Sequence, residues 1–151
     1  MANAPFDLLI LNATIIDGTG ADRYNADIAI SNDRIAKIGK IGGQTKISTI
    51  DAAGKVLSPG FIDVHTHDDH ALIMWPDMTF KASQGVTSVV AGNCGISLAP
   101  LTWGDSPLPP PLDLLGNGYH FPKVAQFFKF LEQNPPALNA GLLCGHTTLR
   151  A

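Results

Sequence analysis

Two histidines separated by one residue follow an apolar segment, in the stretch DVHTH at residues 63–67. Side chains two residues apart point to the same face of a strand, so His65 and His67 would project together with Asp63 beside them. Two imidazoles at that spacing can hold one metal ion, although two solvated histidines at a strand end would give the same pattern. Asp68 and Asp69 come next, and they either support such a site or form a polar exit from the strand.

A single cysteine, Cys94, lies in the glycine-flanked stretch GNCG at residues 92–95. A thiolate is a strong zinc ligand, and nearby glycines allow the sharp backbone turn that would bring its sulfur to an open site. A free cysteine alone is more often a small buried apolar residue. In a parallel sheet, however, the carboxyl ends of neighbouring strands open on one face, so His65, His67 and Cys94 would converge there. The three residues together favour zinc.

Other residues near the predicted strand ends carry weaker signals. His146 follows a third apolar segment, in CGHTT, and could bind substrate, a metal or only water. Cys144 is expected to pack within the apolar run LLC. His70 and His120 have no pattern around them, so solvated loop positions are expected for both. Trp103, in a proline-rich segment, could cover a substrate pocket or simply pack.

The elements that must position these residues change in kind near residue 56. Residues 6–49 contain short apolar segments separated by the turn signals DGTG and SNDR, which is typical of a hairpin-rich sheet. About forty residues of this kind bury little surface alone, so we expect the sheet to pack on something else.

From residue 56 onward, apolar strands alternate with helical segments. The order is a strand leading to the two histidines, a helix within 71–84 that is interrupted near Pro76 and ended by Gly85, the strand TSVVAGN, a long loop over 101–122, a helix over 123–134, and the strand LNAGLLCGHTTL. This alternation indicates βαβ units and a parallel sheet, which places the chain in the α/β class.

The composition narrows the function classes. Of the 151 residues, 45% are hydrophobic and 15% are charged, with a net charge of −3, which is typical of a globular protein. Lys and Arg are scattered, so we expect no nucleic-acid partner. No apolar run approaches the roughly 20 residues that span a bilayer, so we expect no membrane partner. With no signal peptide and only two cysteines, a cytoplasmic location is expected.

Four stretches of the sequence, LSPGFIDVHTHDD, GVTSVVAGNCGISLAP, PPPLDLLGN and GHTTLRA, resemble the N-acyl-D-amino-acid deacylase (D-aminoacylase) family of the amidohydrolase superfamily. The resemblance covers essentially the whole chain. It implies a TIM-like (β/α)8 barrel with a small β-sandwich built from both termini. Residues 1–55 would then belong to the sandwich, and residues 56–151 would form the first three β/α elements of the barrel.

The same resemblance implies a reaction and a set of metal ligands. His65 and His67 match the family's two histidine ligands, Cys94 matches its cysteine ligand, and His146 remains a candidate for substrate binding. The family hydrolyses the amide of N-acyl-D-amino acids to a carboxylate and a D-amino acid. Zinc would polarise the acyl carbonyl and lower the pKa of a water molecule, and an acid would protonate the leaving amine.

The family draws two further histidine ligands and its catalytic aspartate from later barrel strands, beyond residue 151. We therefore expect an N-terminal segment that is inactive alone. Three strands would leave an open sheet edge, so self-association or a complementing chain is also expected. Two alternatives stay open: a non-catalytic module that oligomerises through its sheet edges, and a cyclic-amide hydrolase of the same superfamily.

Overall fold

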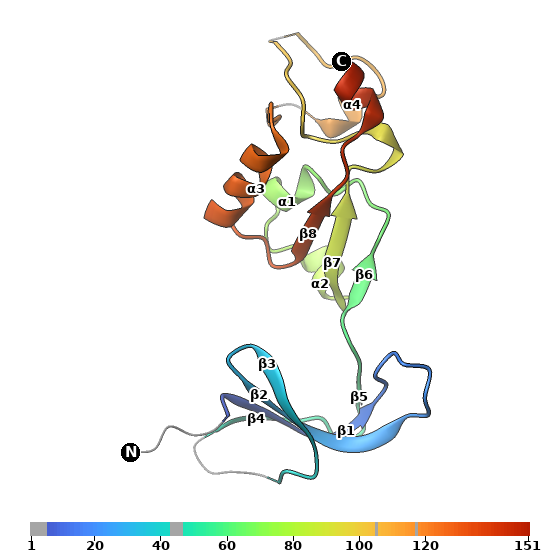
Figure 1. Ribbon diagram of the computed structural model, residues 1–151, viewed down its shortest axis with the longest axis vertical. Coiled ribbons are helices and arrows are strands. Elements are labelled where there is room, and N and C mark those ends of the chain that lie inside the picture. Colours follow the sequence, from blue (N-terminus) through green and yellow to red (C-terminus); the bar gives the residue numbers. More distant parts are fainter. Residues whose placement is uncertain (1–5, 43–46, 105, 117) are drawn as a thin grey trace. The chain divides into compact units, whose positions relative to one another are not determined.

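The computed structural model describes residues 6–42, 47–104, 106–116 and 118–151 (Figure 1). The chain divides into two compact units, Met1–Pro59 and Gly60–Ala151, called here the N-terminal and C-terminal units. None of the described helices is long and apolar enough to cross a membrane.

The N-terminal unit is a mixed β-sheet, as the strand and turn pattern predicts. Its strands are β1 (Leu8–Ile15), β2 (Tyr24–Ser31), β3 (Arg34–Gly39), β4 (Ser48–Asp51) and β5 (Val56–Leu57), with the order β3-β2-β1-β4 and β5 also on β1. The first three strands are antiparallel, whereas β4 and β5 run parallel to β1. Asn32 and Asp33 form the β2–β3 turn with φ of 49° and 60°, as a two-residue hairpin requires.

One part of this sheet leaves apolar side chains open to solvent. Ile35 and Ile38 on β3 are 62% and 47% exposed. They line an apolar hollow together with Ile10, Ile28 and Leu57. The buried part of the unit is small and consists of Leu9, Ala13, Ile15, Ile28, Ala29 and Ala52. This small core confirms the prediction that these strands bury little surface alone.

Asp27 on β2 forms hydrogen bonds with three backbone N–H groups of the N-terminal unit. Its carboxylate accepts hydrogen bonds from the backbone N–H of Asn12 at 2.9 Å, of Ile41 at 2.8 Å and of Gly42 at 3.1 Å. Asn12 has a φ of 62° at an irregularity in β1, so the bond holds a backbone conformation that few residues adopt. These donors lower the pKa of the Asp27 carboxyl.

We expect Asp27→Asn to destabilise the N-terminal unit by about 1 kcal/mol at neutral pH, because the amide NH2 would face a backbone donor. Because the pKa of Asp27 is lowered, its carboxylate stabilises the fold at pH values above 3.8, the ordinary pKa of an aspartate. This contribution is lost as the pH falls through the lowered pKa. Thermal unfolding should therefore separate wild type from variant at pH 7 and bring them together once the pH falls below the lowered pKa. Asp33→Asn, which removes the same charge from the exposed turn, should stay near wild type at pH 7; an equal loss of stability in both variants would contradict the prediction.

The C-terminal unit contains a three-stranded parallel sheet in the order β6-β7-β8. The strands are β6 (Phe61–Asp63), β7 (Val86–Ala91) and β8 (Asn139–Leu142), and Figure 1 shows them side by side. The helices are α1 (Ala71–Met74), α2 (Thr79–Ala82), α3 (Val124–Gln133) and α4 (His146–Arg150), with short 3-10 turns η1 (Asn93–Gly95) and η2 (Leu112–Leu115). The α/β prediction is confirmed for this unit.

Two predicted strands are shorter than the apolar pattern indicates. β6 ends at Asp63, so His65 and His67 lie beyond the strand and not within it. The third predicted strand covers only β8, and the chain enters α4 at His146. The two predicted helices are confirmed, the first as the separate α1 and α2 and the second as α3.

The core of the C-terminal unit lies between the helices, the strands and the long loop. Phe127 of α3 is fully buried against a cluster that includes Leu72, Met78, Leu98, Leu101 and Leu112. Burying a side chain of this size stabilises the fold by roughly 2–3 kcal/mol. Phe61 and Ile62 on the edge strand β6 are 62% and 63% exposed, so the sheet edge is apolar and open, as expected from three strands.

Candidate metal centre

His65, His67 and Cys94 come together at the carboxyl ends of two neighbouring parallel strands. One ligand atom from each residue lies within 4.8 Å of the others. The His65 Nε2 and Cys94 Sγ atoms are 3.2 Å apart, and the two imidazole rings meet edge to face with centroids 6.2 Å apart. All three side chains are exposed, so the group is open on one side.

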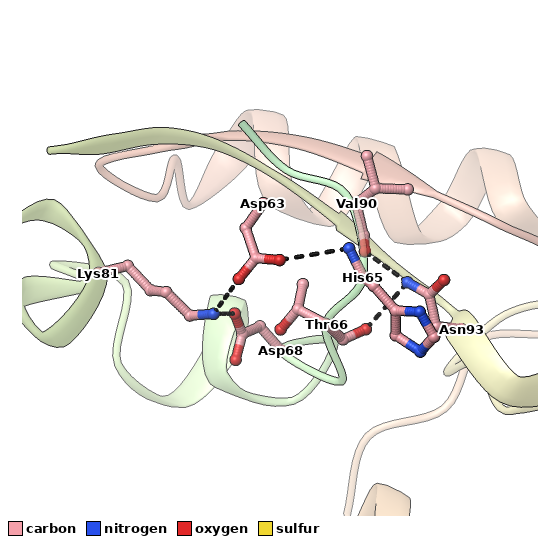
Figure 2. A network of polar contacts seen from close by, with 7 residues as sticks. All are labelled: Asp63, His65, Thr66, Asp68, Lys81, Val90 and Asn93. Atoms are coloured by element: carbon pink, nitrogen blue, oxygen red, sulfur yellow. Dashed lines mark hydrogen bonds and ion pairs between the residues drawn. The ribbon is translucent and has the colours of Figure 1, made fainter. Parts of the chain in front are cut away.

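The segment that carries the histidines is held in place by an acid–base network next to it (Figure 2). The Asp63 carboxylate accepts a hydrogen bond from the backbone N–H of His65 at 3.2 Å. It also forms an ion pair with Lys81 of α2, which in turn lies 3.1 Å from the Asp68 carboxylate. The Lys81 ammonium and the His65 N–H lower the pKa of Asp63, while the Asp63 carboxylate raises the pKa of Lys81. Asp63 and Asp68, which lie on either side of the two histidines in the sequence, therefore both form ion pairs with Lys81.

The Cys94 side chain reaches the histidines because the chain turns sharply after β7. Gly92 and Gly95 have φ of 80°, and Cys94 itself has a φ of 53°. A left-handed conformation is uncommon for a residue other than glycine and costs free energy unless its surroundings hold it. The predicted turn at GNCG is present, and Cys94 adopts a left-handed conformation within it.

Asp69 forms hydrogen bonds with both ends of the loop that carries Cys94, residues 92–98, called here the cysteine loop. The side chain is only 1% exposed, and its carboxylate accepts hydrogen bonds from the backbone N–H of Gly92 at 3.1 Å and of Leu98 at 3.3 Å. Burial raises the pKa of Asp69. Both acidic residues therefore contact neighbouring segments, Asp68 through its ion pair with Lys81 and Asp69 through its bonds to the loop that carries Cys94.

A second set of hydrogen bonds joins the cysteine loop to α4, through residues that the sequence pattern did not reveal. The Ser97 hydroxyl accepts from Gly145 N–H at 2.9 Å, and the Thr148 hydroxyl accepts from Ser97 N–H at 2.8 Å and donates to Ser97 O at 3.1 Å. Ser97 and Thr148 are buried. The two residues are 51 positions apart in the sequence, so no local pattern could indicate that they bond to each other.

The remaining candidates fall in different places. His146 is exposed at the first residue of α4 and is outside the group of three ligand atoms. Cys144 is exposed, so the expectation that it packs in the core is wrong; β8 ends at Leu142, and the chain has already left the sheet. His120 is exposed, as expected, with its Nε2 3.1 Å from Trp103 O. Trp103 is half-buried and lines a hollow with His120.

His70 is the exception among the histidines expected to be solvated. It is half-buried at the start of α1, and its ring lies 6.4 Å from that of Tyr119 and against Gly116. Within the part of the chain that the structure describes, its buried Nε2 has no hydrogen-bond partner. The long loop covers this side chain, which a search for local patterns could not foresee.

The donor set of the candidate centre fits zinc. Imidazole nitrogen and thiolate sulfur are the protein ligands that zinc prefers, and such a soft set disfavours magnesium and calcium. Two donors on one zinc ion stand roughly 3–4 Å apart, which is compatible with the 3.2 Å between His65 Nε2 and Cys94 Sγ. The exposed side leaves room for further ligands and for a substrate.

Two family models match parts of this chain. Residues 48–140 match the family model described as "Amidohydrolase family", and residues 1–59 match "Urease alpha-subunit, N-terminal domain". The chain is 49% identical over 149 residues to the D-aminoacylase of Alcaligenes xylosoxydans xylosoxydans, covering 97% of this chain and 30% of that protein.

Two solved structures resemble the chain closely. A crystal structure of a D-aminoacylase matches with a TM-score of 0.88 and 50% identity, over 97% of this chain and 31% of that one. The N-acyl-D-glutamate deacylase from Bordetella bronchiseptica, complexed with zinc and a phosphonate inhibitor, matches with a TM-score of 0.89 and 43% identity, over 96% of this chain and 30% of that one. The chain thus spans about 30% of the length of the relatives that it matches.

Proposed function

Because this chain belongs to the amidohydrolase family, we propose that it forms the N-terminal segment of a zinc-dependent hydrolase that cleaves N-acyl-D-amino acids to a carboxylate and a D-amino acid. The convergence of His65, His67 and Cys94 within 4.8 Å carries the proposal. The proteins that the chain resembles at 43–49% identity are named D-aminoacylase and deacylases of N-acyl-D-aspartate and N-acyl-D-glutamate, which supports this substrate class.

The proposed architecture is the start of a (β/α)8 barrel over residues 56–151, with residues 1–55 contributing to a small β-sandwich. Parallel strands joined by helices, with apolar and open edges at β6, support the barrel, since a closed barrel needs eight strands and typically about 250 residues. The apolar hollow on the N-terminal sheet supports a sandwich, because such a face needs a covering layer.

In the proposed reaction, His65, His67 and Cys94 would hold the metal. Zinc bound there would supply a Lewis acid for the acyl carbonyl and would lower the pKa of a water molecule. The residues of this chain contribute position: Asp63 and Lys81 hold the histidine segment, and Asp69 holds the cysteine loop. We propose His146 as a substrate contact, because α4 begins beside Gly95 of that loop. The acid for the leaving amine would come from beyond residue 151.

The two alternatives, a non-catalytic module and a cyclic-amide hydrolase, differ from the proposal in the substrate that they would hydrolyse. A non-catalytic module would have no turnover, and a cyclic-amide hydrolase would open hydantoins or cyclic imides. The names of the similar proteins do not favour either one, since they describe hydrolysis of linear N-acyl-D-amino acids.

The test is hydrolysis by the purified full-length protein of a panel of N-acetyl-D-amino acids with apolar and acidic side chains. Their L-enantiomers and hydantoin serve as controls, and released amine is the measured product. We expect turnover of the D-series, a loss of at least about 100-fold after chelation, and recovery with zinc, since a Lewis acid contributes several kcal/mol to such a barrier. Opening of hydantoin without hydrolysis of the D-series would contradict the proposal, and so would metal-independent turnover.

A further inference from the structure

We infer that Asn93 is a positioning residue whose side-chain amide joins the segment carrying His65 and His67 to the loop carrying Cys94. The inference rests on the proposed metal site and assigns a role to a residue that lies beside it. Asn93 directly precedes Cys94, is 8% exposed, and begins η1 one residue after β7.

The Asn93 amide bonds to two backbone carbonyls from different strands' ends (Figure 2). Its Nδ2 atom lies 2.7 Å from Val90 O and 3.2 Å from Thr66 O. Both partners are acceptors, so only the NH2 end of the amide can face them, and its two hydrogens match the two carbonyls. Thr66 is the residue between the two histidines, and Val90 belongs to the strand that leads to Cys94.

One backbone hydrogen bond closes the link between the two segments. Thr66 N–H donates to the same Val90 carbonyl at 3.3 Å. This bond is longer than a typical N–H···O bond of about 2.9–3.0 Å. The 2.7 Å bond to Val90 O fixes the Asn93 amide within its own turn, and the 3.2 Å bond to Thr66 O crosses to the histidine segment. Without Asn93, the bond from Thr66 N–H to Val90 O would be left to hold Thr66 at the end of β7.

The cysteine loop needs such a tie more than an ordinary loop would. Gly92 and Gly95 are the residue type with the widest choice of backbone conformations, and Cys94 between them has a φ of 53°. A loop of this kind has many alternative conformations, in most of which the thiolate would point elsewhere. Asn93 limits them by fixing the backbone next to Cys94 against the backbone between the histidines.

The consequence is that Asn93 should control metal affinity without touching the metal. Groups that orient metal ligands in this indirect way typically change affinity or activity by 10- to 100-fold when they are removed. We therefore expect Asn93→Ala and Asn93→Asp in the full-length protein to lower zinc affinity by on the order of 10- to 100-fold. Asn93→Asp should be the more severe, because a carboxylate would face two carbonyl oxygens in a buried place.

Asn139 offers a matched control for the same chemical change. Its amide also donates to a backbone carbonyl on β7, Thr87 O at 3.1 Å, but near the opposite ends of the strands. Asn139→Asp should leave zinc affinity within about twofold. Zinc affinity is measured by competition with a chromophoric chelator. Cobalt substitution adds a readout that a purely structural role would not move, namely the thiolate-to-cobalt absorption band that reports whether Cys94 is a ligand.

The outcomes separate this inference from the proposed site. Weakened zinc binding and a diminished thiolate–cobalt band in the Asn93 variants, with Asn139→Asp unaffected, are the expected result. Wild-type affinity and an unchanged band in Asn93→Ala would overturn the positioning role, even if its melting temperature fell, provided that Cys94→Ser loses the metal. Retention of metal by Cys94→Ser would overturn the proposed site and this inference with it. Should Asn93→Asp fail to fold, Asn93→Ala decides, because it adds no charge and leaves Val90 O bonded to Thr66 N–H.

Discussion

Cys94→Ser should release zinc from the full-length protein and lower the hydrolysis of N-acyl-D-amino acids by on the order of 100-fold or more. The Cys94 sulfur lies 3.2 Å from His65 Nε2 in a loop with left-handed backbone at three positions, so the side chain is directed at the histidines by the fold. A serine hydroxyl would occupy nearly the same place. It does not deprotonate at neutral pH as a metal-bound thiol does, and so it is a poor zinc ligand.

Cys144→Ser is the matched control, since both cysteines are free and exposed and each follows one of two neighbouring strands. Zinc content by atomic absorption and turnover of the D-substrates should both stay near wild type in this variant. Equal zinc loss in the two variants would point to a general effect of removing an exposed thiol. Unchanged zinc in Cys94→Ser would exclude the cysteine as a ligand and overturn the proposed three-residue site.

The convergence of the candidate ligands could be predicted from the sequence because it follows from sheet topology. Apolar segments with helices between them indicate parallel strands, and parallel strands open on one face. Residues that directly follow two such strands must then lie near one another, whatever the details of the loops. His65, His67 and Cys94 meet this condition, and their ligand atoms lie within 4.8 Å of one another.

The supporting residues could not be predicted, because their roles depend on contacts between distant segments. Asn93 bonds to Thr66, and Ser97 bonds to Thr148, at separations of 27 and 51 residues. The lengths of β6 and β8 were overestimated for a related reason. An apolar run shows which residues avoid water, but the strands end earlier, β6 at Asp63 before the two histidines and β8 at Leu142 before α4.

The exposure of Cys144 and the partial burial of His70 also could not be predicted from their neighbours in the sequence. Cys144 continues an apolar run, yet it lies past the end of β8 and is exposed. His70 follows two aspartates in sequence, yet Gly116 and Tyr119 lie against its ring. The environment of His70 is decided by the long loop, and that of Cys144 by where β8 ends; the local sequence specifies neither.

Gly92→Ala should be among the most damaging single substitutions near the site, with an expected loss of about 3 kcal/mol or more in the free energy of unfolding. Two separate costs add at this position. The φ of 80° is one that alanine rarely adopts, and a Cβ atom would lie only 2.1 Å from the carbonyl oxygen of Leu143. That oxygen belongs to backbone whose N–H bonds to Ala91 O at 2.9 Å, so it cannot move without separating the ends of β7 and β8.

The displacement would reach the proposed metal ligand Cys94, which lies two residues further along the chain. We therefore expect Gly92→Ala to lose zinc as well as stability, even at temperatures where the variant remains folded. Gly145→Ala isolates the steric part of the effect. Its φ of −64° suits alanine, but a Cβ atom there would lie 2.4 Å from Gly95 O on the cysteine loop.

Gly141→Ala supplies the matched control within β8. A Cβ atom at this position would meet its nearest neighbours, Val90 Cγ2 and Val89 O, at 3.8 and 3.9 Å, which is ordinary contact. Such a change should be neutral or stabilising by about 0.5–1 kcal/mol, because it reduces the freedom of the unfolded chain. Chemical unfolding and zinc affinity should rank the variants with Gly141→Ala near wild type, Gly145→Ala lower and Gly92→Ala lowest. If Gly92→Ala and Gly141→Ala behaved alike, the close approach of the two strand ends would not be what holds Cys94 at the histidines.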